Sequence, residues 1–494
     1  NNMNTLLKGL KEEENIALTA NGALAYKSTM NKLYDLFALG GAYRNNTNAD
    51  CILLFKEAYE ENPELALKCL FYLRDIRGGQ GERRFFRVCY KWLVDFDLAA
   101  AHRNLQNIPE FGRWDDLLFL LDTKIDAAVI KLIKEQITED LSIIKNGGAN
   151  VSLCAKWLPS QNSSSEKTKI LANRIRKELG MTSRQYRKTL SLLRKAIKIV
   201  ETQMSENKWN EIEYDKLPSK AGFQYRKAFA RHDFKRYNSF MLDKTTKVNA
   251  GTLYPCDIVH KVLNSDHLTE RAVLNKYWDN LTDYFNGASF NGIAVVDTSG
   301  SMSCCCRGNI QPIDVAISLG LYCADKCSPT SPFYNHYISF SRVAKLVECR
   351  GIDFVDKVTR IYRSNICENT NIYSVFDLIL NTAIKNHVPA ADMPKNIIII
   401  SDMQFDWATD YSGSVQDSIS QQMKQYEKYG YEIPHLIFWN VNAIYDANIP
   451  MKDEKGITFV SGYSPVVFDM ILKEKTGQDL MLDKLNSERY AVIW

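Results

Sequence analysis

The stretch that decides the fold reads Ile293-Ala294-Val295-Val296-Asp297-Thr298-Ser299-Gly300-Ser301-Met302-Ser303. Its apolar, mostly β-branched run predicts a strand that is buried on both faces, as in a parallel sheet. The small, oxygen-bearing residues that follow predict a turn at the carboxyl end of this strand, where open α/β sheets bind their ligands. Asp297, Ser299 and Ser301 alternate along the turn, so their oxygens can converge on one small, hard cation.

Two later segments could complete such a site. An amphipathic helix pattern opens at residues 368–373, which places Thr370 at a helix start. Residues 394–402 read P-K-N-I-I-I-I-S-D, a second strand buried on both faces that ends in Asp402. The alternative is that Asp297 and Asp402 only cap strand ends and that Thr370 is an ordinary helix N-cap.

The D-x-S-x-S spacing, followed in order by the threonine and the second aspartate, resembles the metal-ion-dependent adhesion site of von Willebrand factor A domains. The resemblance implies a Rossmann-like, doubly wound domain over residues 288–494, with a Mg²⁺ or Mn²⁺ ion that can accept an acidic residue of a protein partner. The ligands that it implies are Asp297, Ser299, Ser301, Thr370 and Asp402. The alternation of strand and helix patterns after residue 293 also indicates a doubly wound sheet. No glycine-rich phosphate loop follows the first strand, which argues against nucleotide binding there.

The first half of the chain has helical spacing and no strand signal. Apolar residues recur every three or four positions in successive segments, separated by short Gly, Pro or Asn breaks. The clearest segments are 50–59, 63–73, 82–94, 114–121 and 127–144. They predict a helical domain over residues 1–275, stacked as an α-solenoid with irregular, HEAT-like repeats. The extended surface of such a stack suits long polymers.

Several stretches carry a further resemblance. They are residues 74–84 (R-D-I-R-G-G-Q-G-E-R-R), 112–118 (G-R-W-D-D-L-L), 155–160 (A-K-W-L-P-S), 226–233 (R-K-A-F-A-R-H-D), 249–255 (N-A-G-T-L-Y-P) and 401–406 (S-D-M-Q-F-D). Together they resemble a family catalogued only as a domain of unknown function, with members in cells and in large viruses. More distantly, helical repeats followed by an A domain are similar to the TROVE module of the Ro ribonucleoprotein autoantigen. That similarity implies binding of small noncoding or misfolded RNA.

Charge is divided unevenly along the chain. The net charge of the 494 residues is only +4, but residues 151–262 hold 23 Lys and Arg against 10 Asp and Glu. The remainder is mildly acidic, so the asymmetry favours a polyanionic partner for the first half. Aromatic residues interleave with cations at 223–237, where bases could stack while cations follow the backbone. The alternative is a basic, solvated surface without a partner.

The candidate RNA contacts are the basic side chains of this region and of an upstream turn. They are Arg77, Arg83, Arg84, Lys167, Lys169, Arg174, Arg184, Arg187, Lys188, Arg226, Lys227, Arg231, Lys235 and Arg236. The turn at residues 77–81 could cradle a phosphate with backbone amides, or it could be a plain connection between helices. The motif at 112–116 is interpreted as a helix cap that buries Trp114, with Asp115 or Asp116 pairing Arg113.

The cysteines and the apolar runs restrict the class of protein. Twelve cysteines in a chain of this length lie on apolar helical faces or in no metal spacing, which indicates reduced thiols. The run Cys304-Cys305-Cys306 has no explanation. The first residues are polar and no run reaches the apolar length of a membrane span, so we expect a cytoplasmic protein that does not contact membrane.

These patterns favour a non-catalytic, Ro-like RNA-binding protein with a metal-binding domain that recruits a partner. One alternative is a metal-dependent protein-interaction scaffold, viral or phage in origin, that binds no nucleic acid. A second is a metal-dependent phosphodiesterase, because two close aspartates and a cation could polarise a phosphate. Against catalysis, the histidines are scattered and no pair of nucleophile and base is evident.

Overall fold

The computed structural model describes residues 5–264, 267–303, 310–363, 370–406, 415–444, 449–473 and 475–494. The cysteine run at residues 304–306 therefore lies outside the described residues. So does Glu368, the first residue of the segment 368–373 in which the helix pattern opens. The described cysteines are buried and free, as expected for reduced thiols. No helix in the described part of the chain combines the length and the apolar character needed to cross a membrane.

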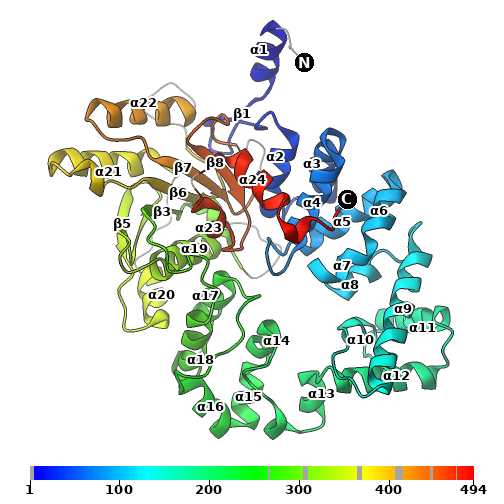
Figure 1. The fold of residues 1–494 in the computed structure, drawn as a ribbon. Coiled ribbons are helices and arrows are strands. Elements are labelled where there is room, and N and C mark those ends of the chain that lie inside the picture. The colour runs from blue at the N-terminus through cyan, green and yellow to red at the C-terminus, as the bar shows by residue number, and fades with distance from the viewer. Residues whose placement is uncertain are drawn as a thin grey trace.

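Helices make up most of the first 280 residues (Figure 1). They are α1 (Thr5–Glu14), α2 (Lys32–Leu39), α3 (Asn48–Glu61), α4 (Pro63–Arg74), α5 (Arg83–Phe96), α6 (Leu98–Asn104), α7 (Ile108–Phe111), α8 (Trp114–Leu118), α9 (Asp126–Lys145), α10 (Cys154–Trp157), α11 (Glu166–Glu178), α12 (Ser183–Ala196), α13 (Val200–Ser205), α14 (Ser219–Gln224), α15 (Arg226–His232), α16 (Phe234–Leu242), α17 (Pro255–Leu263) and α18 (His267–Asp279). Short 3₁₀ turns lie at Gly40–Ala42, Leu105–Asn107 and Trp209–Glu211. The five segments with the clearest helical spacing are α3, α4, α5, α8 and α9.

Local sequence explains where several of these helices begin. Thr47 and Asp50 form a reciprocal capping box at the start of α3, and the Asn62 side chain caps α4, whose first residue is proline. Thr182 and Gln185 form a second capping box at α12. Because these side chains satisfy amides that have no partner within the helix, the boundaries follow the sequence signals closely.

The second half contains a six-stranded sheet in the order β5-β4-β3-β6-β7-β8. Its strands are β3 (Gly292–Asp297), β4 (His336–Phe340), β5 (Ala344–Glu348), β6 (Asn396–Ser401), β7 (His435–Asn440) and β8 (Ile457–Ser461). All neighbouring strands are parallel except β4 and β5, which form an antiparallel edge. Every residue of β3 and β6 is buried, as their apolar runs predict.

Helices cover both faces of this sheet, with α19 on one side and α21 and α22 on the other (Figure 1). The helices of this half are α19 (Pro312–Lys326), α20 (Phe354–Arg363), α21 (Tyr373–Lys385), α22 (Val415–Lys428), α23 (Val467–Ile471) and α24 (Gly477–Leu485). The 3₁₀ turns are η4 (Gly300–Ser303), η5 (Ala390–Asp392) and η6 (Glu488–Tyr490). A helix-rich first half followed by a mixed, predominantly parallel sheet is the α plus α/β arrangement expected from the sequence.

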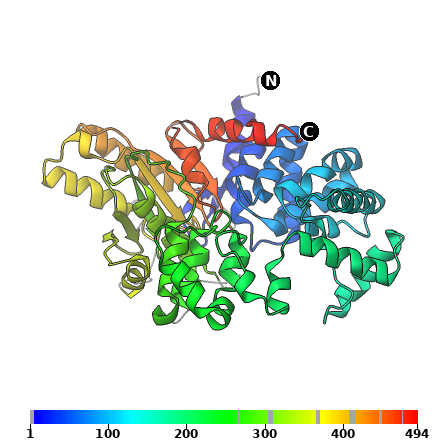
Figure 2. The ribbon, with the colours of Figure 1, turned by 60° about the horizontal axis from the view of Figure 1, so that its bottom comes forward.

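The helices follow an arc that leaves the sheet at α2 and returns to it at α17 (Figures 1 and 2). At the outgoing end, α2 packs on β8, and the Tyr34 hydroxyl accepts a hydrogen bond from the Phe459 amide at 2.8 Å. At the returning end, α17 packs on α19. The arc is therefore tied to the sheet at both ends.

One expectation about the first half is wrong, because it contains two strands. β1 (Ile16–Leu18) and β2 (Leu24–Tyr26) form an antiparallel hairpin. Each strand has only three residues, too few to show an alternating pattern in the sequence. Contacts with the second half of the chain hold the hairpin in place, since Gly22 pairs with Asp406 and Tyr26 pairs with Ile449 in isolated β-bridges.

Candidate metal and nucleic-acid sites

The two predicted aspartates lie side by side at the carboxyl ends of neighbouring strands. β3 and β6 pair in parallel with Val296 opposite Ile400, so Asp297 and Asp402 follow at the same edge of the sheet. Both side chains are fully buried. Asp297 Oδ1 accepts the Ser299 amide at 2.9 Å, and its Oδ2 accepts the Ser401 hydroxyl at 2.6 Å. The tight turn after β3 thus holds one carboxylate in a fixed orientation.

The second carboxylate is less completely satisfied. Asp402 Oδ1 accepts the Gln404 amide at 3.1 Å. Asp402 Oδ2 is buried and has no hydrogen-bond partner among the described residues. Burial raises the pKa of both aspartates, and the Asp297 charge raises the pKa of Asp402 further. Two adjacent buried carboxylates, one of which has a free oxygen, would attract a cation, because a positive charge would offset their mutual repulsion.

Hydroxyl groups surround this pair. Ser299 Oγ and Ser301 Oγ lie 3.2 Å apart on the turn after β3. Ser301 also favours the charged form of Asp402, lowering its pKa against the effect of burial. Thr370 joins the cluster through Asp406, which accepts the Thr370 amide at 2.7 Å and whose charge raises the pKa of Asp297. The structure thus gathers all five predicted ligands at one edge of the sheet. Because α21 begins only at Tyr373, Thr370 is not its N-cap.

The β1–β2 hairpin lies directly against this cluster. Asn21 donates from Nδ2 to the Gln404 carbonyl at 2.6 Å and to Thr370 Oγ1 at 3.4 Å. The Thr19 hydroxyl donates to the Phe405 carbonyl at 2.8 Å, and the Ala20 amide to Gln404 Oε1 at 2.6 Å. Sequence reasoning missed these residues, because no local pattern connects a loop near position 20 with a strand end near position 402. The sequence did offer a signal for Ser401, because this residue directly precedes Asp402 at the end of the quoted strand.

A cation at this position would depend on hydroxyl oxygens as much as on carboxylates. No group of three or more His, Cys, Asp and Glu side chains in the described ranges could hold a metal ion. Two carboxylates and three hydroxyls are nevertheless the oxygen donors that small hard cations accept, with water completing their shell. The oxygen donors therefore fit Mg²⁺ or Mn²⁺ and do not fit a metal that prefers thiolate ligands.

The predicted RNA contacts separate into free and paired side chains. Arg83, Lys167, Arg184, Lys188, Arg231 and Lys235 are exposed and make no hydrogen bond or ion pair with other described residues. Arg187 is also exposed and contacts only the Ser183 carbonyl of its own helix. Three of these cations, Arg184, Arg187 and Lys188, lie within about one turn of α12, and this helix contains no acidic residue.

The other predicted cations have partners within the protein. They are Arg77 with Glu110, Arg84 with Asn46 and Asn48, Lys169 with Glu166, Arg174 with Asp122, Asp126 and Glu178, Lys227 with Glu270, and Arg236 with Asp233. The exposed ion pairs among these can exchange partners at little cost, so pairing lowers the availability of their cations without removing them from the surface. Arg84 and Arg174 are half-buried and are therefore less available.

Arg226 requires a correction, because it is not a surface residue. Its guanidinium is buried and its Nε lies 3.0 Å from Glu270 Oε1, which is also buried. The neighbouring rings of Phe223, Phe229 and Tyr237 are core residues as well. The expected stacking of RNA bases on these three rings is therefore wrong. The segment 223–237 is amphipathic: these three rings and Arg226 point into the core, whereas Lys227, Arg231, Lys235, Arg236 and Phe234 remain exposed.

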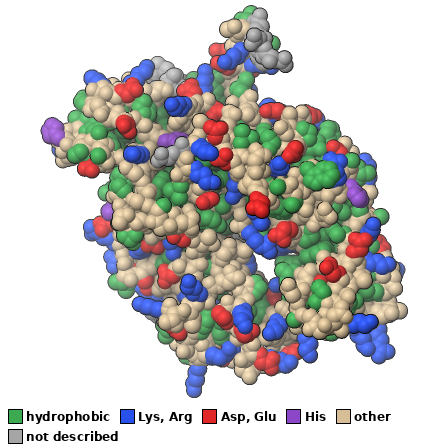
Figure 3. All heavy atoms as spheres, viewed as in Figure 1, with side chains coloured by type: hydrophobic (Ala, Val, Ile, Leu, Met, Phe, Trp, Pro, Cys, Tyr) green, Lys and Arg blue, Asp and Glu red, His purple; other side chains and the backbone are tan. Residues whose placement is uncertain are grey.

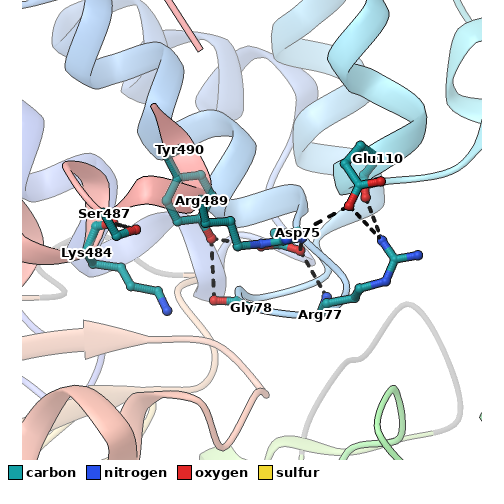
Figure 4. A network of polar contacts seen from close by, with 8 residues as sticks. All are labelled: Asp75, Arg77, Gly78, Glu110, Lys484, Ser487, Arg489 and Tyr490. Carbon is teal, nitrogen blue, oxygen red and sulfur yellow. Dashed lines mark hydrogen bonds and ion pairs between the residues drawn. The ribbon is translucent and has the colours of Figure 1, made fainter. Parts of the chain in front are cut away.

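The turn at residues 77–81 connects two helices, and most of its amides are already hydrogen-bonded, which argues against the backbone phosphate cradle. Gln80 donates to the Tyr72 carbonyl and Gly81 to the Asp75 carbonyl, both at 3.2 Å, and the Arg77 amide donates to Asp75 Oδ1 at 3.0 Å. Asp75 accepts from Arg489 Nη2 at 2.7 Å and from the Tyr490 hydroxyl at 2.9 Å, in the network of polar contacts drawn in Figure 4. Burial raises the pKa of Asp75, but the Arg489 side chain and the Arg77 and Gly78 amides together hold that pKa below its ordinary value. The turn thus fastens the end of the chain to α4.

The motif at residues 112–116 caps a helix, but its ion pair differs from the expected one. The Arg113 amide donates to Asp116 Oδ2 at 2.9 Å, and α8 begins at the next residue. The fully buried Asp116 carboxylate binds Arg74 Nη2 at 2.7 Å and Arg87 Nε at 2.6 Å. The Arg113 guanidinium instead lies over the Trp157 ring, 4.6 Å from its centroid. Arg113 was absent from the predicted RNA contacts, yet its charged group pairs with no acid among the described residues.

Comparisons with known proteins cover both halves. A family model described as a domain of unknown function (DUF2828) matches residues 19–131 and 123–286, and a second one (DUF7788) matches residues 291–490. An uncharacterised protein of Acanthamoeba polyphaga mimivirus is 30% identical over 499 residues. That alignment spans 93% of this chain and 85% of the viral protein, so the similarity includes the helical arc and the sheet together.

Proposed function

We propose that this chain, which belongs to the family of the domain of unknown function DUF2828, binds single-stranded or structured RNA through α11 and α12. The family description states no activity, so the proposal is argued from the geometry. The observation that carries this proposal is the surface of α12. This helix exposes Arg184, Arg187 and Lys188 and contains no acidic residue to neutralise them. In an otherwise nearly neutral protein, an uncompensated basic helix favours a polyanion.

We also infer a finer fold and partner class from the resemblances. The helical arc is proposed to be an irregular α-solenoid, and the sheet a von Willebrand factor A-like domain. The strand order and the clustering of Asp297 with Asp402 support the second assignment. Helical repeats joined to such a domain are similar in arrangement to Ro, which is why RNA is preferred to duplex DNA as the partner. In this proposal the protein is non-catalytic.

The salt dependence of RNA affinity tests the main proposal. Each phosphate contact releases counterions, so affinity for a single-stranded oligoribonucleotide should fall about tenfold or more between about 50 and 200 mM salt. The measurement is a filter-binding titration of the full chain at several salt concentrations. Affinity that is independent of salt, or no binding at low salt, would remove the proposal.

A triple substitution locates the RNA-binding surface. Arg184→Ala, Arg187→Ala and Lys188→Ala together should weaken RNA binding and reduce the salt slope by about one for each phosphate that is no longer bound. The matched control replaces Lys56, Lys124 and Lys131 with alanine, because these exposed lysines carry the same charge but pair with acids. Equal weakening in both variants would show that net charge, not the α12 surface, sets the affinity.

A second candidate function uses the cluster at the sheet edge. The buried, unpartnered Asp402 Oδ2 beside Asp297 favours a bound Mg²⁺ or Mn²⁺ ion. The proposed ligands are Asp297, Ser299, Ser301, Thr370 and Asp402, and the ion would accept an acidic side chain of a protein partner. The hairpin residue Asn21 lies beside Thr370, so it would border the partner's approach.

A further inference from the structure

The arc of helices encloses two adjoining cavities. The larger, about 1520 Å³, lies among α7, α8, α10, α13 and α14, and the smaller, about 350 Å³, lies between the α4–α5 turn and the start of α17. Ile76, Arg113, Lys220 and Thr252 line both. The space-filling view is hollowed between α8 and α14, with Lys and Arg side chains at its border (Figure 3).

The lining of both cavities is positively charged. Six Lys and Arg side chains and two carboxylates line the smaller cavity, and seven cations and three carboxylates line the larger. Most cations of the smaller cavity have partners: Arg44 binds Glu82, Arg74 binds Asp116, Arg84 binds Asn48, and Lys220 binds Asp257. Arg84 keeps its charge, because its partners are neutral groups, but its guanidinium is already hydrogen-bonded. The guanidinium groups of Arg83 and Arg113 are the two in this lining that have no hydrogen bond or ion pair with another described residue.

The charges of these two arginines repel each other, and neither guanidinium is paired with an acid among the described residues. Neither guanidinium forms a hydrogen bond or ion pair with another residue that the structure describes. Burial, and then the charge of Arg83, lowers the pKa of Arg113 to about 10. The nearby Asp115 and Asp116 favour the charged forms of both arginines, but they offset the repulsion only in part, because Asp115 also binds Arg87 and Asp116 binds both Arg74 and Arg87. An anion placed between the two guanidinium groups would relieve this repulsion.

An aromatic ring stands next to this position. Trp157 lines the larger cavity, half-buried, with the Arg113 guanidinium 4.6 Å and the Lys156 ammonium 5.7 Å from its ring centroid. Arg113 thus connects the aromatic surface of one cavity with the cationic surface of the other. A ligand that carries an aromatic base and a phosphate has the matching composition, because bases pack on aromatic rings and phosphates bind guanidinium groups.

We propose that the smaller cavity binds a nucleotide phosphate between Arg83 and Arg113, and that the attached nucleoside occupies the larger cavity beside Trp157. The inference deepens the proposed RNA binding and rests on it. The exposed surface of α11 and α12 would then hold the RNA backbone, while the cavity receives one nucleotide of the same strand. A free nucleotide carries the same base and phosphate as a nucleotide of an RNA strand, so the test must distinguish free nucleotide from RNA as the ligand.

The test measures binding of three probes to the full chain: a single-stranded oligoribonucleotide, adenosine monophosphate and inorganic phosphate. The double variant Arg83→Gln with Arg113→Gln should bind the oligoribonucleotide about tenfold more weakly at about 50 mM salt, with the salt slope reduced by about one, because both arginines hold the same phosphate. The matched control is Arg350→Gln with Arg360→Gln, two arginines that line neither cavity. Arg83→Gln alone is the second variant, because the exposed Arg83 can be replaced without disturbing folding, and it should bind about threefold more weakly.

Each outcome decides a separate question. Wild-type protein that binds no RNA at low salt overturns the proposed function. RNA binding that depends on the α12 residues but is unchanged by Arg83→Gln and by the double variant overturns the cavity inference alone. Binding of adenosine monophosphate that requires both arginines, without binding of the oligoribonucleotide, supports the phosphate site and identifies free nucleotide as its source. Binding of phosphate that both arginine-to-glutamine pairs weaken equally overturns the site.

Discussion

Asp402→Ala is expected to abolish the rise in melting temperature that Mg²⁺ produces in the wild-type protein. The substitution removes the unpartnered Oδ2 and leaves Asp297 as the sole carboxylate of the proposed ligand set. A ligand at one hundred times its Kd stabilises the folded state by about 2.7 kcal/mol, so millimolar Mg²⁺ produces an effect of that size for a Kd of about 10 μM and a smaller one for weaker binding. Thermal melting with and without Mg²⁺, together with calorimetry, measures it.

The control for this substitution is Asp392→Ala, an exposed carboxylate in η5. It should leave the Mg²⁺-dependent rise intact. If Asp402→Ala and Asp297→Ala both bind Mg²⁺ as the wild type does, the ligand assignment is wrong. If Asp402→Ala stays folded but loses RNA affinity, the cation belongs to the RNA site, and the phosphodiesterase alternative becomes the preferred one.

The central strands and the residues at their ends could be predicted because their signals are local. Continuous apolar runs at 293–296 and 397–400 predict doubly buried strands, and the structure confirms them as β3 and β6. Two parallel strands that end in Asp and in Ser-Asp must bring those residues to one edge once they are neighbours. The resemblance to a family catalogued as a domain of unknown function is also confirmed, because the quoted stretches fall within the two matched regions.

The hairpin and the partners of the arginines could not be predicted because they depend on long-range contacts. Asn21 meets Gln404 across 383 residues, and no periodicity near position 20 signals that contact. Arg226 and Arg231 belong to the same basic run, yet the first is buried against Glu270 and the second is exposed. Sequence gives the charge of such residues, whereas tertiary packing decides which of them reach solvent.

The turn at residues 75–82 links the proposed phosphate site to the fold. Asp75 holds the end of the chain through Arg489, and the Gln80 carbonyl accepts the Tyr254 hydroxyl at 2.8 Å from the returning arm of the arc. The same turn leads into Arg83, which lines the smaller cavity. Because one turn joins the outgoing helices, the returning helices and the chain end, it fixes the position of the proposed phosphate site relative to the sheet.

Asp116→Ala is expected to lower the free energy of unfolding by about 3–5 kcal/mol, which is the cost of leaving a buried charge without its partner. The Asp116 carboxylate is fully buried and binds both Arg74 and Arg87, and Arg74 is only 1% exposed. The substitution also removes the side-chain acceptor of the Arg113 amide at the start of α8. Urea unfolding followed by circular dichroism measures the change.

The matched control is Asp95→Ala, which breaks the exposed pair between Asp95 and Lys124. There the two charges are solvated, so the expected decrease is below about 1 kcal/mol. A decrease for Asp116→Ala no larger than that of the control would show that water or a rearranged acid satisfies Arg74. A double variant that also replaces Arg74 with methionine should recover much of the stability, because the cost arises from the unpaired charge rather than from the missing pair.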